Sequence, residues 1–343
     1  MKLREPTEQV YSSMQLKNKI RISVCIPNYN RSGDLDDVLK DCMSQTSLPY
    51  EIIIQDDSYD QKEIKKINRV IARYKKVKYY RNKKNIGLAS NVNRVVKRAK
   101  GDYVVIVNND DRLSTFYIEE IQKAIEKYPK HSVYTTNACA ITDEGKVFGD
   151  YRLFENDTLI KPKIGIIMLW KNFFLNLISV SGATIYERKF LQKNLFVPEL
   201  GNEADLNNAL KLLSGVNIMY IHVPIYYVRM NAANTSIEVR ATNQRLEAYI
   251  RNCIAIYSQY GKQFKNTPHY LTRPKTVFFL QLKIKYNYPL KNVNEIIGIR
   301  NLSELIEIIL LIPGYILAQH KFRLLFQIHR FSYQKYFPQI RNV

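Results

Sequence analysis

Short apolar runs alternate regularly with amphipathic segments over the first 107 residues, and this alternation constrains the fold more than any other feature. Four runs have the β-rich composition of buried strands and fall at residues 21–27, 51–55, 77–80 and 102–107. Between them, apolar residues recur at helical spacing in residues 33–45, 61–74 and 88–99. Continuous apolar strands that alternate with amphipathic helices are typical of a parallel sheet covered on both faces. The sequence therefore predicts an α/β fold whose sheet is mostly parallel.

The alternation weakens beyond residue 135. There we expect a helix at residues 162–177, a strand at 182–186, a helix at 205–213 and a strand at 216–220. From residue 238 the pattern is mostly helical, with a break at Thr267-Pro268. We therefore divide the chain into an N-terminal arm (residues 1–19), an α/β domain (20–235) and a basic helical C-terminal region (236–343).

The charge balance predicts an anionic partner. The chain has 52 Lys and Arg against 31 Asp and Glu, a formal net charge of +21, and +12 of it lies in residues 240–343. In that region cationic residues alternate with aromatic and aliphatic ones, which suits the surface of an anionic membrane. A helical subdomain with a solvated basic face is the alternative. We expect no nucleic-acid binding, because no known nucleic-acid motif is present and an apolar run interrupts the basic residues at 309–316.

Several features bear on the compartment. The four cysteines form no CxxC pair, which fits a reducing compartment better than a disulfide scaffold or a zinc ribbon. The first 19 residues have no apolar core of a signal peptide. The longest apolar stretch, residues 305–318, is shorter than the roughly 20 residues of a membrane span. We expect a cytoplasmic protein that binds peripherally to the inner face of the cell membrane.

Polar residues follow each of the first four predicted strands. The carboxyl ends of parallel strands share one edge, where ligands bind in open α/β sheets. The four segments are Pro27-Asn28-Tyr29-Asn30-Arg31, Asp56-Asp57-Ser58, Asn85-Ile86-Gly87-Leu88 and Asn108-Asn109-Asp110-Asp111. They combine an aromatic ring, which can stack on a planar base, with carboxylates, which can accept a base N–H or bind a hard divalent cation. Cationic side chains such as Arg31 and Lys84 can neutralise phosphate.

No Walker A motif is present and no GxGxxG follows the first strand, which argues against P-loop NTPases and dinucleotide-binding enzymes.

Four motifs occur in a characteristic order: VCIPNYNR, EIIIQDDS, NIGLASNVN and GDYVVIVNNDD. Together they resemble family 2 glycosyltransferases of the GT-A fold, the inverting enzymes that use nucleotide-diphosphate sugars and include the bacterial surface-polysaccharide type. The resemblance covers residues 21–229. It implies a Rossmann-like domain with helices on both faces, here followed by the basic helical region.

The resemblance also implies roles for individual residues. Those of the nucleotide site would be Pro27, Tyr29, Asn30, Arg31, Asp57, Gly87, Asn93, Asp110 and Arg229. Within this set Asp57 would bind the base, and the loop at Gly87 would close the pocket together with Asn93. Arg229 would hold the diphosphate, although Asn231 stands where the family has His.

The family's DxD pattern falls on Asn108-Asn109-Asp110 and is followed by Asp111, so that Asn replaces the first acid. The resemblance implies a divalent cation, Mn²⁺ or Mg²⁺, held by Asp110 and Asp111, with Asp111 expected to be the better ligand. Residues 201–206 resemble the family's EDxDL segment. Glu203 would then be the base that deprotonates the acceptor hydroxyl, and Asp205 remains an alternative base.

The implied activity is transfer of a sugar, most simply from a uridine diphosphate sugar, to a hydroxyl of a glycan or lipid-linked glycan in cell-surface polysaccharide synthesis. Two alternatives stay open. A nucleotidyltransferase would usually need a Gly-rich basic loop after the first strand, which PNYNR does not supply. A non-catalytic glycan- or membrane-binding protein on the same scaffold would fit the loss of acid at Asn108 and Asn202. Two purely structural roles are further alternatives: Asp56-Asp57 would form a turn, and Asp110-Asp111 would cap the following helix.

Overall fold

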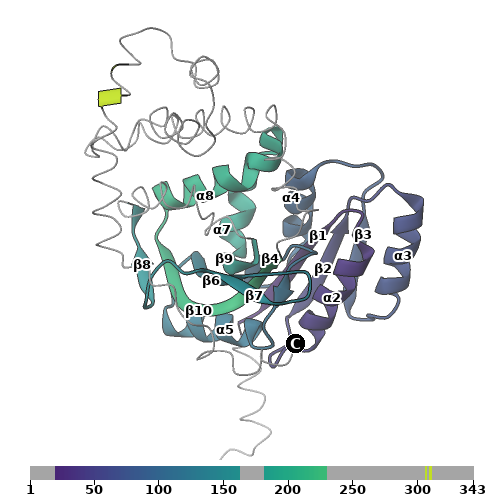
Figure 1. The fold of residues 1–343 in the computed structure, drawn as a ribbon, viewed down its shortest axis with the longest axis horizontal. Helices are drawn as coiled ribbons and strands as arrows, with labels where there is room; N and C mark the ends of the chain where they lie inside the picture. Colours follow the sequence, from purple (N-terminus) through teal and green to yellow (C-terminus); the bar gives the residue numbers. More distant parts are fainter. Residues whose placement is uncertain (1–19, 163–180, 230–305, 307–308, 311–343) are drawn as a thin grey trace, which may run out of the picture.

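The structure of the chain is a computed structural model that describes residues 20–162, 181–229, 306 and 309–310 (Figure 1). The predicted N-terminal arm, all of the predicted helix at 162–177 except its first residue, and nearly all of the basic C-terminal region lie outside the described residues. Within the described part of the chain, no helix is both long enough and apolar enough to cross a bilayer.

The described strands form one ten-stranded sheet in the order β3-β2-β1-β4-β9-β6-β10-β5, with β7 paired to β6 and β8 paired to β10. The strands are β1 (Ile22–Asn28), β2 (Glu51–Asp56), β3 (Val77–Arg81), β4 (Tyr103–Ile106), β5 (Arg112–Leu113), β6 (Val133–Ile141), β7 (Val147–Tyr151), β8 (Thr158–Ile160), β9 (Thr184–Glu187) and β10 (Ile218–Arg229). Neighbours from β3 to β4 are parallel, β9 is antiparallel to both β4 and β6, and β6 is parallel to β10.

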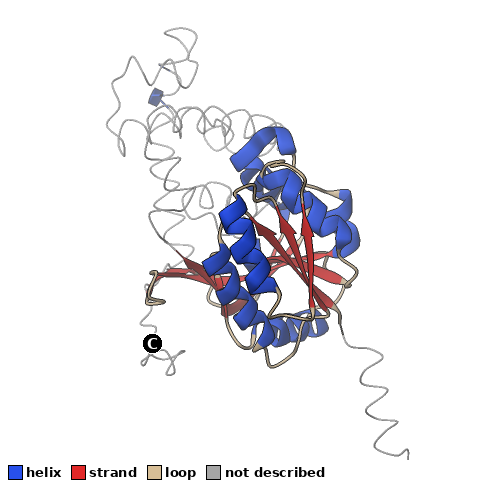
Figure 2. Cartoon of the chain, turned by 90° about the vertical axis from the view of Figure 1, so that its right-hand side faces the viewer, coloured by secondary structure: helices blue, strands red, loops and turns tan. Residues whose placement is uncertain are grey.

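Helices cover both faces of this sheet (Figure 2). They are α2 (Ser32–Met43), α3 (Gln61–Ile71), α4 (Leu88–Arg98), α5 (Tyr117–Lys127), α7 (Arg188–Lys193) and α8 (Ala204–Gly215), with 3₁₀ turns η1 (Ser181–Ala183) and η2 (Pro198–Glu203). The start of α3 has a clear local cause, because Asp60 accepts hydrogen bonds from the backbone N–H groups of Lys62 and Glu63.

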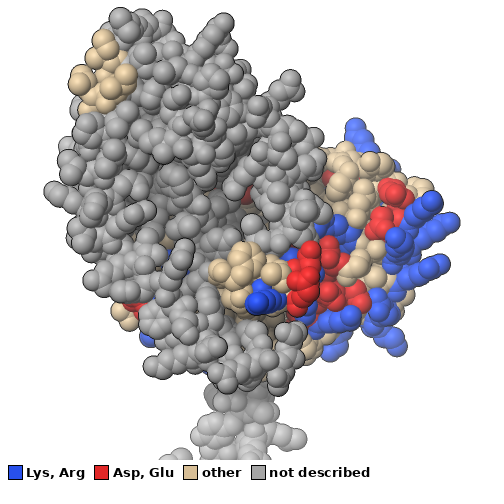
Figure 3. All heavy atoms as spheres, viewed as in Figure 1, with Lys and Arg blue, Asp and Glu red and all other residues tan. Residues whose placement is uncertain are grey.

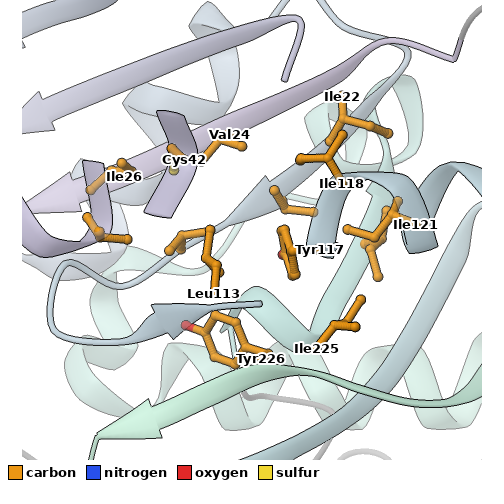
Figure 4. Packing of buried hydrophobic residues seen from close by; sticks show 14 of the residues in the cluster. Ile22, Val24, Ile26, Cys42, Leu113, Tyr117, Ile118, Ile121, Ile225 and Tyr226 are labelled. Carbon is orange, nitrogen blue, oxygen red and sulfur yellow. The ribbon is translucent and has the colours of Figure 1, made fainter. Parts of the chain in front are cut away.

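Successive residues of β1 point to opposite faces, and this alternation divides the core. Val24 and Ile26 belong to a buried cluster that also contains residues of α2, α5 and β10 (Figure 4). On the other face, the thiol of Cys25 lies 3.7 Å from the backbone oxygen of Val95 in α4. β1 is thus buried on both sides, which explains its uninterrupted apolar sequence.

The predicted order of strands and helices through β4 is confirmed. Further along the chain the sequence reading was incomplete. β6 was not predicted, and its run of Thr, Asn and Ala does not look like a strand although all nine residues are buried. The strand expected at 216–220 extends to Arg229, because it bends at irregularities around Pro224 and continues beside β6 and β5. The strand expected at 182–186 begins only after η1.

Candidate active site

The sheet order reverses at β1, which lies between β2 and β4, and so creates a switch point at their carboxyl ends. Asn28, the last residue of β1, joins both neighbours through its side-chain amide. Its Nδ2 donates to Asp56 Oδ1 at 2.9 Å, and its Oδ1 accepts from Asn109 Nδ2 at 2.6 Å. These contacts bring the segments after the three central strands to one place.

Asp56 braces this edge. It is fully buried, and its carboxylate accepts hydrogen bonds from the Ser58 hydroxyl at 2.6 Å and the Tyr79 hydroxyl at 2.7 Å, besides the one from Asn28. With its oxygens engaged inside the protein, Asp56 fixes the turn after β2.

Asp57 holds the loop that follows β3. Its carboxylate accepts from Asn82 Nδ2 at 2.9 Å and from the backbone N–H groups of Ile86 and Gly87, each at 3.0 Å. Gly87 has a φ of 82°, a left-handed value that favours glycine, and directly precedes α4. The residue predicted to bind a base therefore also shapes the predicted pocket wall.

Two residues of this edge were missed in the sequence. Asn82 Nδ2 donates to Asn91 Oδ1 at 2.9 Å as well as to Asp57, and Asn91 Nδ2 donates to the backbone oxygen of Gln55 at 2.8 Å. Both amides are buried, at 3% and 2% exposure. A buried amide network needs nearly every donor and acceptor to be paired, so these residues fix the relative positions of β2, β3 and α4.

An aromatic surface lies next to Asp57. Tyr29 is 43% exposed, and its ring centroid is 6.1 Å from that of Tyr59. Burial, together with hydrogen bonding to Tyr59, raises the pKa of the Tyr29 phenol, and the charge of Asp57 adds to the shift. Asn30 follows with a left-handed φ of 49°, and its N–H donates to the Ser58 hydroxyl at 2.8 Å. Its buried side-chain oxygen has no hydrogen-bond partner among the described residues. Pro27 is buried within β1 and pairs with β2, so it holds the end of the strand from which this surface extends.

Asp111 is 2% exposed and lies behind the edge. Its Oδ2 accepts from the Tyr226 hydroxyl at 2.5 Å and from Asn108 Nδ2 at 3.0 Å, and its Oδ1 accepts from the Arg229 N–H at 2.9 Å. Burial raises the pKa of Asp111 to about 7, with a further contribution from the charge of Asp110, while these hydrogen bonds oppose the shift.

Asp110 is the more accessible acid of the pair, with 18% of its side chain exposed. Its Oδ2 lies 3.0 Å from a guanidinium nitrogen of Arg31, which also contacts Asp34 at 3.4 Å. Burial raises the pKa of Asp110, and the charge of Arg31 counteracts it. The alternative that these acids cap a helix fails, since α5 begins at Tyr117 with Phe116 at its N-cap and no side-chain cap.

The remaining predicted residues lie on different elements. The Arg229 guanidinium lies 3.8 Å from Asp37 of α2. Asn93 is directed at the backbone of Phe196, donating to its oxygen at 2.8 Å and accepting from its N–H at 3.0 Å. Glu203 ends η2, and Asp205 lies in the first turn of α8. Asn93 thus joins the backbone just ahead of η2, which ends at Glu203, to α4, and η2 itself also contacts α4.

Residues 23–194 match the family model described as glycosyl transferase family 2. The chain belongs to glycosyl transferase family 2. This family 2 enzyme is 24% identical, over 78% of its length and 88% of the relative's, to an uncharacterized glycosyltransferase of Haemophilus influenzae. It is 25% identical to the GalNAc(5)-diNAcBac-PP-undecaprenol beta-1,3-glucosyltransferase of Campylobacter jejuni, over 54% of this chain and 58% of that protein.

The fold of the glycosyltransferase is similar to that of S. aureus TarS residues 1–349 in complex with UDP-GlcNAc. The TM-score is 0.55 with 17% sequence identity, and the match covers 87% of this chain and 81% of the TarS chain. The fold is therefore GT-A, and the family establishes a glycosyltransferase.

The family implies a divalent cation, and the acidic side chains of the candidate site can be compared with the ligands that such an ion needs. Among the described residues, no three His, Cys, Asp or Glu side chains gather closely enough to form a metal site by themselves. Three protein donors already point at the Asp111 oxygens, whereas Asp110 is partly exposed and shares one oxygen with Arg31. A cation held through one or two carboxylates and completed by phosphate and water oxygens fits this donor set, as is common for Mg²⁺.

Besides Asn82 and Asn91, Tyr226 is a third residue of the glycosyltransferase site that the sequence did not reveal. Its ring occupies the space beside Gly182, where an added Cβ would lie 1.9 Å from a ring carbon. Tyr117 packs on the same ring, with centroids 6.3 Å apart, and donates to the backbone oxygen of Gly182 at 2.6 Å. In the sequence, Tyr226 stands three residues before Arg229, the residue to which the resemblance gives the diphosphate.

Proposed function

We propose that this glycosyltransferase moves a sugar from a uridine diphosphate sugar to a hydroxyl of a glycan or lipid-linked glycan, with inversion, in cell-surface polysaccharide synthesis. One observation carries the proposal. The segment from Asn28 to Arg31 contacts both acidic loops, because the Asn28 oxygen accepts from the Asp57 N–H at 2.9 Å and Arg31 lies 3.0 Å from Asp110. An exposed aromatic ring and a cluster of charged side chains thus lie along one short stretch of chain.

The nucleoside half of the site would lie over Tyr29, with Asp57 beside it. Tyr29 offers an exposed ring for stacking, and the unpartnered oxygen of Asn30 offers an acceptor. Asp57 accepts hydrogen bonds from within the protein, so it would contribute through the loop at Gly87 as well as through any direct contact with the base. The TarS complex with UDP-GlcNAc, which shares the fold, supports uridine as the nucleoside.

The diphosphate half would lie at Asp110, Arg31 and Arg229. A Mn²⁺ or Mg²⁺ ion held by Asp110, with Asp111 behind it, would supply positive charge for the departing diphosphate. Arg31 is held beside Asp110 in the position to bind the same phosphates. Asp110 is more exposed than Asp111, and this favours Asp110 as the direct ligand of the cation. The family resemblance of the sequence had favoured Asp111.

The acceptor base is proposed to be Glu203, with Asp205 as the rival. Both lie at the junction of η2 and α8, and Asn93 ties the preceding segment to α4. A carboxylate can take the proton of the acceptor hydroxyl late in a single displacement, which inverts the anomeric centre. The name of the Campylobacter relative, which specifies an undecaprenol-linked acceptor, supports a lipid-linked glycan.

We also propose a cytoplasmic location at the inner membrane face. The division of the chain at about residue 235 and the docking of the basic region at 236–343 on anionic lipid belong to this proposal. The net charge of that region supports it. Removing residues 300–343 is expected to reduce co-sedimentation with anionic vesicles, and unchanged sedimentation would reject the docking role of that region.

Donor binding and turnover test the proposal separately. In a thermal-shift screen of UDP, GDP, CDP and dTDP sugars with Mn²⁺, we expect UDP sugars to raise the melting temperature most. Glu203→Gln should retain this shift and lose donor turnover at least about 100-fold, within the range of general base catalysis. Asp205→Asn is the matched control. Full turnover in Glu203→Gln with loss in Asp205→Asn would transfer the role of base to Asp205, and no shift with any nucleotide would refute the proposed donor class.

A further inference from the structure

The basic charge of the first 239 residues is concentrated in one helix–turn–strand segment. Residues 61–84 contain eleven Lys or Arg and a single acid, a net charge of +10, whereas residues 1–239 together carry +9. The rest of this part of the chain is therefore close to neutral. These 24 residues span α3, β3 and the turns around them.

One stripe along α3 and the turn that follows it carries five of these eleven charges. Lys62, Lys65, Lys66, Arg69 and Arg73 follow one another at helical spacing and are exposed, on the side opposite the buried Ile64, Ile67 and Val70. Figure 3 shows Lys and Arg gathered over the outer side of α3. The apolar face of α3 is used in the core, so its cationic face is free to meet a partner.

The second part of the basic surface lies along β3, the outermost strand on that side of the sheet. Lys75, Lys76, Lys78, Arg81 and Lys83 are all exposed there. We call the eleven cationic side chains of residues 61–84 the α3–β3 basic face.

Few of these charges are compensated within the described parts of the chain. Lys66 pairs with Glu63 at 2.7 Å, Arg73 with Asp36 at 2.9 Å and Lys78 with Glu51 at 2.7 Å. The other eight cations form no ion pair with any residue that the structure describes. Like charges at this density repel one another, and an anionic partner would relieve that repulsion.

We propose that the α3–β3 basic face docks the enzyme on an anionic lipid bilayer. Eight of its eleven cations are lysines, which act as flexible point charges, and they are spread over α3, the outermost strand β3 and the turns beside them. A row of this kind suits many headgroups on an extended surface better than one phosphate in a pocket. Each Lys or Arg near an anionic leaflet strengthens binding by roughly fivefold.

The position of the face relative to the site favours a membrane over a soluble polyanion. α3 starts four residues after Asp57, and β3 ends one residue before Asn82, whose side chain donates to Asp57. Docking here would keep the candidate site next to the headgroups, where a lipid-linked acceptor lies. The link to a lipid-linked acceptor rests on the proposed function. The docking itself does not, because binding to vesicles is measured without donor or acceptor. Lysine on an edge strand also prevents strand pairing, but this does not account for the stripe on α3.

The test uses the full chain and four substitutions on the face: Lys62→Gln, Lys65→Gln, Arg69→Gln and Lys76→Gln. The control chain carries the same loss of charge elsewhere, as Lys123→Gln, Lys146→Gln, Lys189→Gln and Lys193→Gln, all exposed. Partitioning is measured on vesicles of phosphatidylcholine with and without phosphatidylglycerol, at low and high salt. Melting temperatures check that both variants are folded, and a soluble polyphosphate serves as the competing anion.

We expect the wild-type chain to bind the anionic vesicles and not the neutral ones, with binding lost at high salt. The face variant should bind at least about tenfold more weakly, and the control variant should change by less than about threefold. Equal binding of the face variant and the wild type would overturn the proposal. Equal weakening of both variants would overturn it too, since net charge alone would then be responsible. If the wild-type chain bound polyphosphate but no vesicles, and the face variant lost the polyphosphate binding, the face would be assigned to a soluble polyanion instead.

Discussion

The hydroxyl of Tyr226 donates a 2.5 Å hydrogen bond to Oδ2 of Asp111, across 115 residues of sequence. This contact joins β10 to the acidic loop after β4. Together with the Arg229 N–H, which donates to Oδ1 of the same carboxylate, it makes the end of β10 part of the candidate active site.

Replacing Tyr226 by Phe should remove one hydrogen bond to a buried carboxylate while keeping the ring. We expect the free energy of unfolding to fall by about 1–3 kcal/mol, the range for losing a partner of a buried polar group. The apparent affinity for Mn²⁺, followed by thermal shift, should weaken as Asp111 loses its fixed orientation. Urea denaturation measures the first effect, and an unchanged midpoint would show that the hydroxyl contributes nothing.

Gly182→Ala should be more damaging, although the change is a single methyl group. The new Cβ would lie 1.9 Å from the Tyr226 ring, so the ring or the η1 turn that contains Gly182 must move. Overpacking of this kind costs about 1–3 kcal/mol or more. The matched control is Gly33→Ala in α2, where nothing lies within 4 Å of the added atom, and it should be neutral or slightly stabilising. Equal melting temperatures for the two variants would contradict the packing.

Asp111 should make stability depend on pH. Burial raises its pKa to about 7 in the folded chain, well above the value near 4 for an unfolded Asp. Between these values the folded state binds a proton that the unfolded state has lost, so stability falls as pH rises from about 4 to about 7. In metal-free buffer, Asp111→Asn should flatten this part of the stability profile. A profile with the wild-type slope would show that the carboxyl does not titrate there.

Asp57→Asn should loosen the loop at Gly87. An amide keeps one acceptor oxygen, so it cannot serve all the donors that now converge on the carboxylate from Asn82, Ile86 and Gly87. We expect destabilisation of about 1–3 kcal/mol and weaker nucleotide binding. Hydrogen exchange of the Ile86 and Gly87 amides reports the loop directly. Unchanged protection there, with lost nucleotide affinity, would confine Asp57 to contact with the base.

Asn93→Ala separates two roles for one residue. Its amide makes a pair of hydrogen bonds to the backbone of Phe196, ahead of the segment that carries Glu203. We therefore expect turnover to fall about tenfold or more with little change in donor affinity, because misplacement of a catalytic group affects the chemical step. Asn194→Ala is the control, since the side chain of this C-cap residue donates to the Phe190 oxygen of its own helix α7. A large loss of donor affinity would return Asn93 to the nucleotide pocket.

The alternation of apolar runs and amphipathic helices by itself determined the order of elements from β1 to β4. Local periodicity records which residues face the core, and short crossovers leave few ways to connect parallel strands. The same logic placed Asp57, Asp110 and Asp111 at one edge. It did not reveal β6, whose Thr, Asn and Ala residues lack the apolar pattern of the earlier strands and whose partners β9 and β10 lie far along the chain.

Tertiary structure decided which acid lies behind the edge and which faces it, and it brought Tyr226 and Gly182 to Asp111. These choices depend on contacts between residues far apart in the chain, and no periodicity in the sequence encodes them. Burial, and with it the pKa of Asp111, is a property of the surrounding atoms and not of the residue. The sequence specified the chemical groups that could meet, while the packing of β10 against the central strands determined how they are held.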